Sequence, residues 1–205
     1  MSVAPEVRLS AVDPARPCGE RLKGFSFQAM LDVCEARYGA GAFTDWAARH
    51  HLDALAISTS PWVPVEYCFS LAETVVNERH GGDLQAAAGL GADCAAREIN
   101  AVFRFVLGFT SPTTLLQLGS RFWRQYYDRS ELVVVEAVGD SVQLELRGWA
   151  LMNAVAASVH CGAMLQWLTC CRAPGARFTA LEFAAPGLLK LSAAWGTAAN
   201  GAPER

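Results

Sequence analysis

Residues 131–147 read ELVVVEAVGDSVQLELR, a stretch whose first half is rich in valine and whose second half alternates between apolar and polar side chains. In its second half Val142, Leu144 and Leu146 are separated by single polar residues, and Gly139-Asp140 stands between the two halves. Alternation is typical of strands with one buried face, and a Gly-Asp pair between two such runs is typical of a tight turn. We therefore predict an antiparallel hairpin here.

The segments after this hairpin predict a helix and then a second hairpin. An Ala-rich run at about residues 151–168 has the length of a helix, and residues 178–184 and 188–195 flank a turn at Pro186-Gly187. Strands that pair locally around one covering helix are typical of an α+β domain rather than a parallel α/β sheet. The predicted fold class is therefore α+β, with a helical N-terminal half followed by a small antiparallel sheet in hairpin–helix–hairpin order.

The residues before the first hairpin have the spacing of helices interrupted by breakers. The strongest periodicity runs from Ile99 to Leu107, and we assign it to a helix that begins at the N-cap Asp83. Ser111-Pro112 is typical of the start of the next helix. We predict a helix-breaking segment at 57–64 and helices at about 24–39, 43–55, 65–79, 83–107 and 111–128.

Two glycines, Gly89 and Gly91, lie in the first half of the predicted 83–107 helix. In a helix interior each glycine costs about 1 kcal/mol relative to alanine. We therefore expect either close packing against another element or a break in the helix at this point.

The length of 205 residues fits one domain. Residues 1–22 carry scattered prolines and charges, and we assign them to a leader that the sequence leaves either ordered or flexible. We predict a single α+β, ligand-binding-like domain over residues 23–196 and a small polar tail at 197–205.

The composition indicates a large apolar interior, or apolar surface reserved for a ligand or partner. Hydrophobic residues make up 52% of the chain and charged residues 18%, which is more apolar than an average soluble domain. A net charge of −3 leaves no basic stripe to neutralise phosphates, which excludes nucleic acid as a partner. The seven cysteines are odd in number and lie mostly in helical patterns without a secretory signal before them, so we predict a reduced, cytoplasmic protein.

The run from Ala150 to Cys171 contains no Asp, Glu, Lys or Arg. About 20 such residues are enough to span a bilayer, but this run is rich in Ala and Gly and has polar residues along its length. We interpret it as a buried helix or a dimer-interface helix, and we predict no membrane span. A homodimer or another protein partner is accordingly expected.

Specific enzyme motifs do not occur in the sequence, which has no Gly-rich phosphate loop, His-Glu-x-x-His, Gly-x-Ser-x-Gly or Cys-x-x-Cys. We therefore expect a binding protein more than an enzyme. His160, beside Cys161 in the uncharged run, is a weak candidate ligand for haem iron or another metal. The alternative is a core histidine hydrogen-bonded to a backbone carbonyl or to Asn153, since no Cys/His spacing supplies further metal ligands.

The aromatic residues Phe122, Trp123, Tyr126 and Tyr127 form a stripe at helical spacing. A helix with aromatic side chains on two adjacent faces cannot bury all of them against one sheet, so part of the stripe lines a pocket or partner surface, or the stripe is plain core with a rim. We predict an apolar ligand pocket lined by some of the following residues: Phe103, Leu107, Leu115, Phe122, Trp123, Tyr126 and Trp149.

The run Ser60-Pro61-Trp62-Val63-Pro64, the helix to Gly81-Gly82-Asp83 and the triplet Leu90-Gly91-Ala92 resemble a family expanded in myxobacteria. That family is similar in its order of elements to haem nitric-oxide-binding domains, 4-vinyl-reductase domains and the Bet3-like subunits of TRAPP. In this fold group helices precede a small antiparallel sheet, and a helix between strands helps to enclose an apolar cavity. The resemblance covers about residues 24–196, including Leu115-Leu116-Gln117-Leu118, the Gly162-containing helix and the strands to Trp195.

Two departures from haem nitric-oxide-binding domains bear on the ligand. In those domains the proximal histidine lies on the helix before the hairpin, and a Tyr-x-Ser-x-Arg motif holds the haem propionates. Here the corresponding helix, residues 113–128, has no histidine, and the hairpin strand reads LELRG at 144–148. The cysteine-rich metal cluster of some 4-vinyl-reductase domains is only echoed, by Cys161, Cys170 and Cys171. The resemblance therefore implies a cavity without naming a cofactor.

Three functions follow from the sequence. We expect a non-enzymatic sensory or ligand-binding domain with an apolar pocket for a small hydrophobic molecule. The alternative is a structural or interaction module that dimerises through the Ala150–Cys171 helix, as Bet3-like folds assemble into complexes. The third is haem or metal binding through His160. The ligand and the cofactor are not identified by the sequence.

Overall fold

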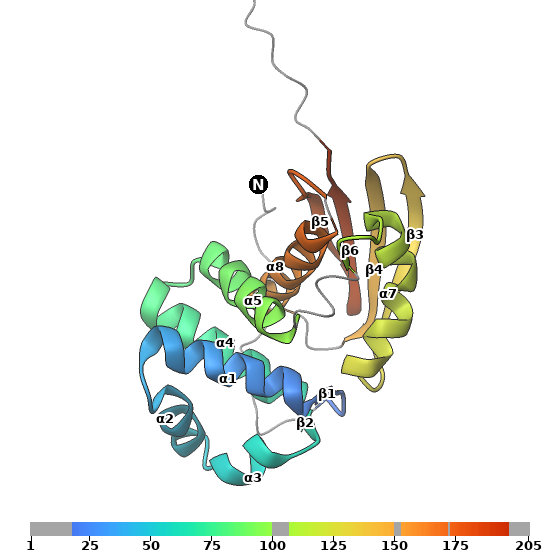
Figure 1. The fold of residues 1–205 in the computed structure, drawn as a ribbon. Coiled ribbons are helices and arrows are strands. Elements are labelled where there is room, and N and C mark those ends of the chain that lie inside the picture. Colours follow the sequence, from blue (N-terminus) through green and yellow to red (C-terminus); the bar gives the residue numbers. More distant parts are fainter. Residues whose placement is uncertain (1–17, 100–106, 150–152, 172, 197–205) are drawn as a thin grey trace, which may run out of the picture.

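The computed structural model describes residues 18–99, 107–149, 153–171 and 173–196 (Figure 1). Its helices are α1 Gly24–Tyr38, α2 Ala42–Arg49, α3 Ala54–Thr59, α4 Val65–His80, α5 Leu84–Glu98, α7 Pro112–Tyr126 and α8 Ala154–Cys170. Its strands are β1 Arg21–Lys23, β2 Trp62–Pro64, β3 Glu131–Val138, β4 Ser141–Trp149, β5 Arg177–Ala185 and β6 Gly187–Ala194. This order confirms the predicted α+β class, with helices first and then hairpin, helix and hairpin.

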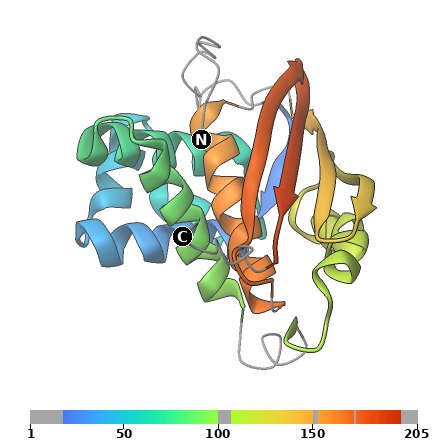
Figure 2. The same cartoon turned by 90° about the horizontal axis from the view of Figure 1, so that it is seen from above.

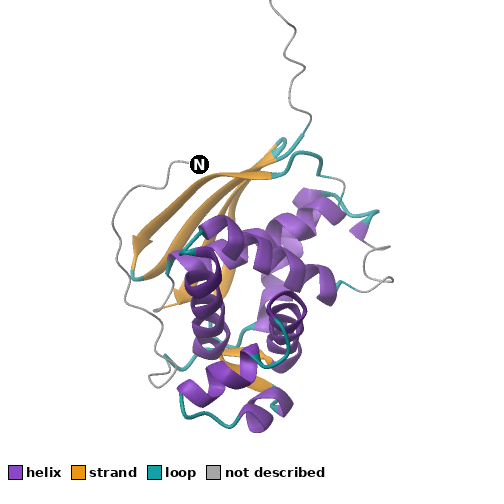
Figure 3. Cartoon of the chain, turned by 90° about the vertical axis from the view of Figure 1, so that its left-hand side faces the viewer, coloured by secondary structure: helices purple, strands orange, loops and turns teal. Residues whose placement is uncertain are grey.

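The larger sheet is antiparallel and has the strand order β3-β4-β6-β5, so the two predicted hairpins join through β4 and β6. Every second side chain of these central strands is buried: Leu144 lies opposite Leu191, and Leu146 lies opposite Leu189. Cross-strand pairs of this kind stabilise one face of a sheet. Figure 3 shows the helices gathered on one side of the sheet.

Helix α8 lies between the sheet and α5, and α5 crosses α8 in close contact (Figure 2). A Cβ atom at Gly91 would lie 1.9 Å from the carbonyl oxygen of Val159, and one at Gly162 would lie 1.8 Å from the carbonyl oxygen of Ala88. Both positions therefore need glycine, because the two helices touch backbone to backbone. At Gly89 the nearest atom is the end of an arginine side chain 3.8 Å away, so the predicted close packing is confirmed at Gly91 and not at Gly89.

Burial within the chain accounts for the absence of charge in α8. Of its residues only Thr169 is exposed, and the described part of the chain contains no helix long and apolar enough to cross a membrane. The sheet and α5 cover much of α8, while Leu165 and Gln166 stay partly exposed. The predicted dimerisation through residues 150–171 stays a prediction. Residues 150–152 lie outside the described residues, and dimerisation through another surface stays a prediction.

The predicted helix at 83–107 was too long. Helix α5 starts at the predicted N-cap, where the Asp83 carboxylate accepts a hydrogen bond from the Gln85 amide at 2.9 Å, but it ends at Glu98. Ile99 has a ψ of 89°, outside the helical range, and residues 100–106 lie outside the described residues. Ile99 and Leu107 are nevertheless buried in one small cluster. Both residues therefore have the burial that the periodicity predicted, although neither belongs to α5.

The predicted helix at 43–55 is divided into α2 and α3 at His50-His51, where His51 has a positive φ of 57°. The segment at 57–64 predicted as a breaker completes α3 and then forms β2, which pairs with β1. Strand β1 lies in the predicted leader, where Leu22 is buried. Residues 18–22 of the predicted leader therefore pack against the domain, and the predicted domain bounds stay a prediction. Residues 1–17 and the predicted tail at 197–205 lie outside the described residues.

Candidate ligand-binding cavity

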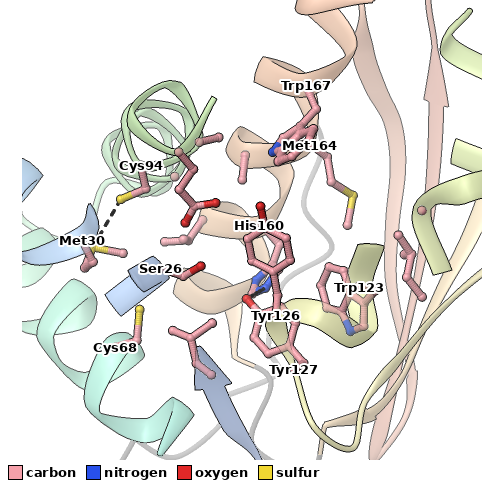
Figure 4. A pocket seen from close by; sticks show the side chains of 18 of the residues that line it. Ser26, Met30, Cys68, Cys94, Trp123, Tyr126, Tyr127, His160, Met164 and Trp167 are labelled. Carbon is pink, nitrogen blue, oxygen red and sulfur yellow. Dashed lines mark hydrogen bonds between the residues drawn. The ribbon is translucent and has the colours of Figure 1, made fainter. Parts of the chain in front are cut away.

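A cavity of about 160 Å³, partly open to solvent, lies between α1, α4, α5, α7 and α8 and is also lined by Leu22 of β1 and Leu132 of β3 (Figure 4). Most of its wall is made of aromatic, aliphatic and sulfur-containing side chains. An apolar cavity of about 150 Å³ in another protein stays dry and binds benzene. This cavity therefore has room for one small aromatic molecule.

Helix α7 supplies the aromatic side of the cavity. Its first turn is fixed by Ser111, whose hydroxyl accepts a hydrogen bond from the Thr114 amide at 3.0 Å. At the other end Trp123, Tyr126 and Tyr127 follow the spacing of one helix face and all line the cavity. The indole nitrogen of Trp123 donates to a buried serine hydroxyl at 2.9 Å, so the orientation of this ring is held by a hydrogen bond as well as by packing.

His160 lies on α8 as a neutral core histidine. Its Nδ1 donates to the carbonyl oxygen of Ala156 at 2.8 Å, and because a carbonyl only accepts, Nε2 is left to accept from the Tyr127 hydroxyl at 3.0 Å. Burial lowers the pKa of His160 to about 4, and Trp149 packs against the ring with centroids 4.4 Å apart. The predicted bond to a backbone carbonyl is confirmed, whereas Asn153, the other predicted partner, caps α8 instead.

Sulfur atoms line the side of the cavity next to α1, α4 and α5. The Cys94 thiol lies 3.8 Å from the Met30 sulfur, and Cys68 lines the same wall. Burial raises the pKa of the Cys68 and Cys94 thiols far above the usual value, so both stay uncharged and are poor nucleophiles. Within the described ranges no group of three or more His, Cys, Asp or Glu side chains is placed to hold a metal ion.

One end of the cavity is polar and is formed by Glu98, Ser26 and Tyr126. Burial raises the pKa of the Glu98 carboxyl to about 7, while the Ser26 and Tyr126 hydroxyls beside it act in the opposite direction. Ser26 is only 8% exposed. The Ser26 hydroxyl is near enough to the Glu98 carboxyl to lower its pKa. However, it lies within hydrogen-bonding distance and angle of no described residue.

The structure brings together part of the predicted pocket. Leu115, Trp123 and Tyr126 line the cavity. Leu107 is buried in a neighbouring cluster with Leu115, and Trp149 lies behind His160 rather than at the cavity surface. The two remaining predictions concern Phe103, which lies outside the described residues, and Phe122, whose side chain is not described.

Glu98 is the site residue that the sequence analysis missed. It follows Arg97 at the end of a helical pattern and has the appearance of an ordinary surface charge. However, Gly91, Cys94 and Ala95 precede it at helical spacing and all three are buried. A carboxyl at the next position of this face was the available signal.

No protein-family model matches the sequence, and no curated protein matches it. Solved structures are similar in fold. The Fe(II) unliganded H-NOX protein from K. algicida has a TM-score of 0.66 at 13% identity, over 86% of this chain and 97% of that chain. An H-NOX protein from S. oneidensis in the Fe(II)NO state has a TM-score of 0.63 at 11% identity, over 86% of this chain and 100% of that chain.

An oxygen-binding H-NOX domain related to soluble guanylate cyclases has a TM-score of 0.59 at 9% identity, over 86% of this chain and 96% of that chain. Identities this low establish the fold alone. The chain therefore has the H-NOX fold, as the resemblance to haem nitric-oxide-binding domains predicted. The myxobacterial part of that resemblance stays a prediction.

Proposed function

We propose that this chain is a non-enzymatic, sensory ligand-binding domain that takes one small, mainly apolar molecule into the cavity between α1, α4, α5, α7 and α8. The observation that carries this proposal is the cavity itself, about 160 Å³ in volume and walled mostly by apolar side chains. Interiors are normally packed without voids of this size. Such a cavity is costly for stability, so a bound molecule that fills it would stabilise the folded chain.

Haem is the first ligand to consider, because the fold neighbours include Fe(II) H-NOX proteins. The residues present do not fit it. Pockets for drug-sized ligands run from about 300 to 1,000 Å³, and this cavity has about 160 Å³. The described residues that line it include no Lys or Arg to pair with two propionates, and their acidic member is Glu98.

The described residues also offer no ready protein ligand for the iron of a haem. Helix α7 has no histidine and β4 has no Tyr-x-Ser-x-Arg motif, which are the two departures noted in the sequence. His160 does line the cavity, but both of its ring nitrogens are already hydrogen-bonded, to Ala156 and Tyr127. Haem or metal binding through His160 would first require Tyr127 to move away, so we do not propose it.

The chemistry of the lining also favours binding over catalysis. Its thiols are uncharged, and its histidine is neutral and enclosed by aromatic rings. An activated thiol nucleophile has a lowered pKa, whereas burial and the negative charge of Glu98 both raise the pKa of Cys68 and Cys94. These properties suit a site that holds a molecule without reacting with it.

Ethylbenzene is a suitable probe, and thermal unfolding is a suitable measurement. A molecule that binds the folded state alone raises the Tm, so we expect saturating ethylbenzene to raise it. Ala163→Leu, which places a larger side chain in the cavity wall, should abolish this increase. The matched control is Ala36→Leu, the same exchange at an exposed position of α1, which should leave the increase unchanged.

The competing haem function is tested in the same preparations. Protein expressed with excess haem should show no stoichiometric absorption band in the Soret region. A stoichiometric band that disappears in His160→Ala would replace our proposal with haem binding. An ethylbenzene response that is equal in Ala163→Leu and in the wild type would place the binding outside this cavity and would also contradict the proposal.

A further inference from the structure

We propose that the molecule bound in this cavity carries a protonated amine, and that this ammonium group binds between Glu98 and Ser26 at the polar end. The inference rests on the proposed function and specifies its ligand class: a small apolar body with one cationic head. The cavity would then discriminate by charge as well as by size.

The first step is the position of Glu98. Its side chain is the one acidic group among the described residues that line the cavity, and it is the last residue of α5. A helix C-terminus carries the negative end of the helix dipole, so a carboxylate is unfavourable there and a cation is favourable. The carboxylate and the dipole of α5 therefore attract an ammonium group together.

The second step is the unpartnered hydroxyl of Ser26. This side chain belongs to α1 and is 92% buried, and its hydroxyl points into the cavity (Figure 4). A buried polar atom without a hydrogen bond destabilises the folded chain, and within the described chain Ser26 Oγ has no partner. An ammonium group has three N–H donors, so it can donate to Ser26 and to Glu98 at once.

The third step is the charge of the surroundings. The titratable groups that face Glu98 are Tyr126 from α7, Tyr127 directly after α7, Cys68 from α4 and Cys94 from α5, with His160 on α8 across the same cavity. The pKa of every one of these acids is raised and that of His160 is lowered. All five are therefore neutral at pH 7, and none supplies a positive charge to neutralise Glu98.

The fourth step is the shape of the ligand. Across the cavity from Ser26 the wall includes the ring of Trp123 (Figure 4), and Trp167 packs edge-on against Tyr126. A flat aromatic ring packs well against such side chains, and the cavity volume suits a single ring. Benzylamine has this ring and an ammonium group at neutral pH, while ethylbenzene has the same shape without the charge.

The experiment compares the affinities of benzylamine, ethylbenzene and benzoate by isothermal titration calorimetry at pH 8. We expect benzylamine to bind at least about tenfold more tightly than ethylbenzene, because a hydrogen bond to a charged group contributes a factor of this order. Benzoate should bind least, since its charge has the same sign as Glu98. From pH 6 to pH 8 the benzylamine affinity should rise about tenfold as Glu98, with a pKa of about 7, ionises, and ethylbenzene should not respond.

The variants locate the effect. Glu98→Gln keeps the shape of the side chain and should reduce the benzylamine preference to about twofold or less, and Ser26→Ala should weaken benzylamine severalfold without changing ethylbenzene. Glu182→Gln is the control, because Glu182 lies on β5, away from the cavity lining. The pH series on the wild-type protein tests the same point without any variant.

Ethylbenzene binding without a preference for benzylamine would overturn the ammonium site and leave the proposed cavity function in place. A preference that persists in Glu98→Gln would also overturn it. If neither probe binds, the cavity function itself fails, and the ammonium site fails with it. Binding of benzylamine that requires Glu98 supports both proposals.

Discussion

Replacing Gly91 by alanine tests how closely α5 and α8 pack. The new Cβ would lie 1.9 Å from the Val159 carbonyl oxygen, whereas ordinary contact begins at 3.4 Å. The helices would therefore have to separate by about 1.5 Å, the difference between these two distances. Overpacking of this kind costs about 1–3 kcal/mol and occasionally more. Since the atom that has to move is helix backbone, no rotamer change relieves the clash.

We expect Gly91→Ala to lower the free energy of unfolding by about 3 kcal/mol, even after the roughly 1 kcal/mol that alanine gains in helix propensity. For a chain of this size the Tm should fall by roughly 6–12 °C. Urea unfolding followed by far-UV circular dichroism measures the free energy, provided that the m-value is unchanged. The fall in Tm is measured by heating under the same buffer conditions.

Gly89→Ala is the matched control, because it is the same exchange two residues away on the same helix. Its nearest neighbour is 3.8 Å away, so only the propensity gain remains, and we expect about 1 kcal/mol of stabilisation. Gly162→Ala should resemble Gly91→Ala, and the two together should cost less than their sum because one separation of the helices relieves both contacts. Equal stabilities for the Gly91→Ala and Gly89→Ala variants would refute the backbone contact.

Other predictions concern titration, capping and the aromatic wall. His160 has a pKa of about 4 in the folded chain against 6.5 unfolded, so protonation linked to His160 should cost on the order of 3 kcal/mol as the pH falls from 6.5 towards 4. Because Glu98 acts in the opposite direction over this range, the measurement is the stability of the wild type minus that of His160→Gln, which should fall by this amount in urea titrations at stepped pH. Glu98 has a pKa of about 7 against 4.5. Its stabilising contribution is therefore complete below pH 4.5 and lost as the pH rises through 7, so Glu98→Gln should be the more stable protein at pH 8, by up to about 3 kcal/mol; equal stability there would contradict the assigned burial. Asn153→Ala removes a buried cap of α8 and should cost about 2 kcal/mol, against about 1 kcal/mol for Asp83→Ala at an exposed cap of α5, both read from urea midpoints. Trp123→Phe removes the indole donor to the Ser130 hydroxyl, which keeps its own hydrogen bond to Glu20, and should cost about 1 kcal/mol in the same assay, with an unchanged circular dichroism spectrum as the check on folding.

The sequence patterns of strands, turns and helix caps predicted those elements that depend on neighbouring residues in the chain. The Val-rich run at 131–138, the Gly139-Asp140 turn and the alternation at 142–147 predicted the first hairpin, and Ser111 and Asp83 marked two helix starts through caps that the structure contains. Strands β1 and β2 were missed because three-residue strands are too short to show a period. Their pairing joins residues far apart in the chain, which no local window contains.

The polar end of the cavity was missed for a related reason. Whether the carboxyl of Glu98 is solvated depends on where α1 and α7 pack against the end of α5. The residues next to Glu98 in the sequence do not determine this packing. The aromatic stripe was easier to interpret, because Trp123 and Tyr126 reveal their face through helical spacing alone. Trp149 was assigned to the pocket on hydrophobicity, and only the packing of His160 in front of it shows why it lies one layer behind.

The backbone contact between α5 and α8 makes one wall of the cavity rigid, whereas the wall formed by α7 is free of such a contact in the described residues. Two helices that touch through glycine cannot yield by turning side chains, so this wall keeps its spacing when a molecule enters. Helix α7, by contrast, packs on β3 and β1 and faces the cavity through aromatic side chains. We expect the strain of filling to be relieved on that side, as a displacement of α7 and the β3 strand beside it. Binding of a molecule in the cavity would then change the position of β3, which is an edge strand of the sheet and can be contacted by another protein.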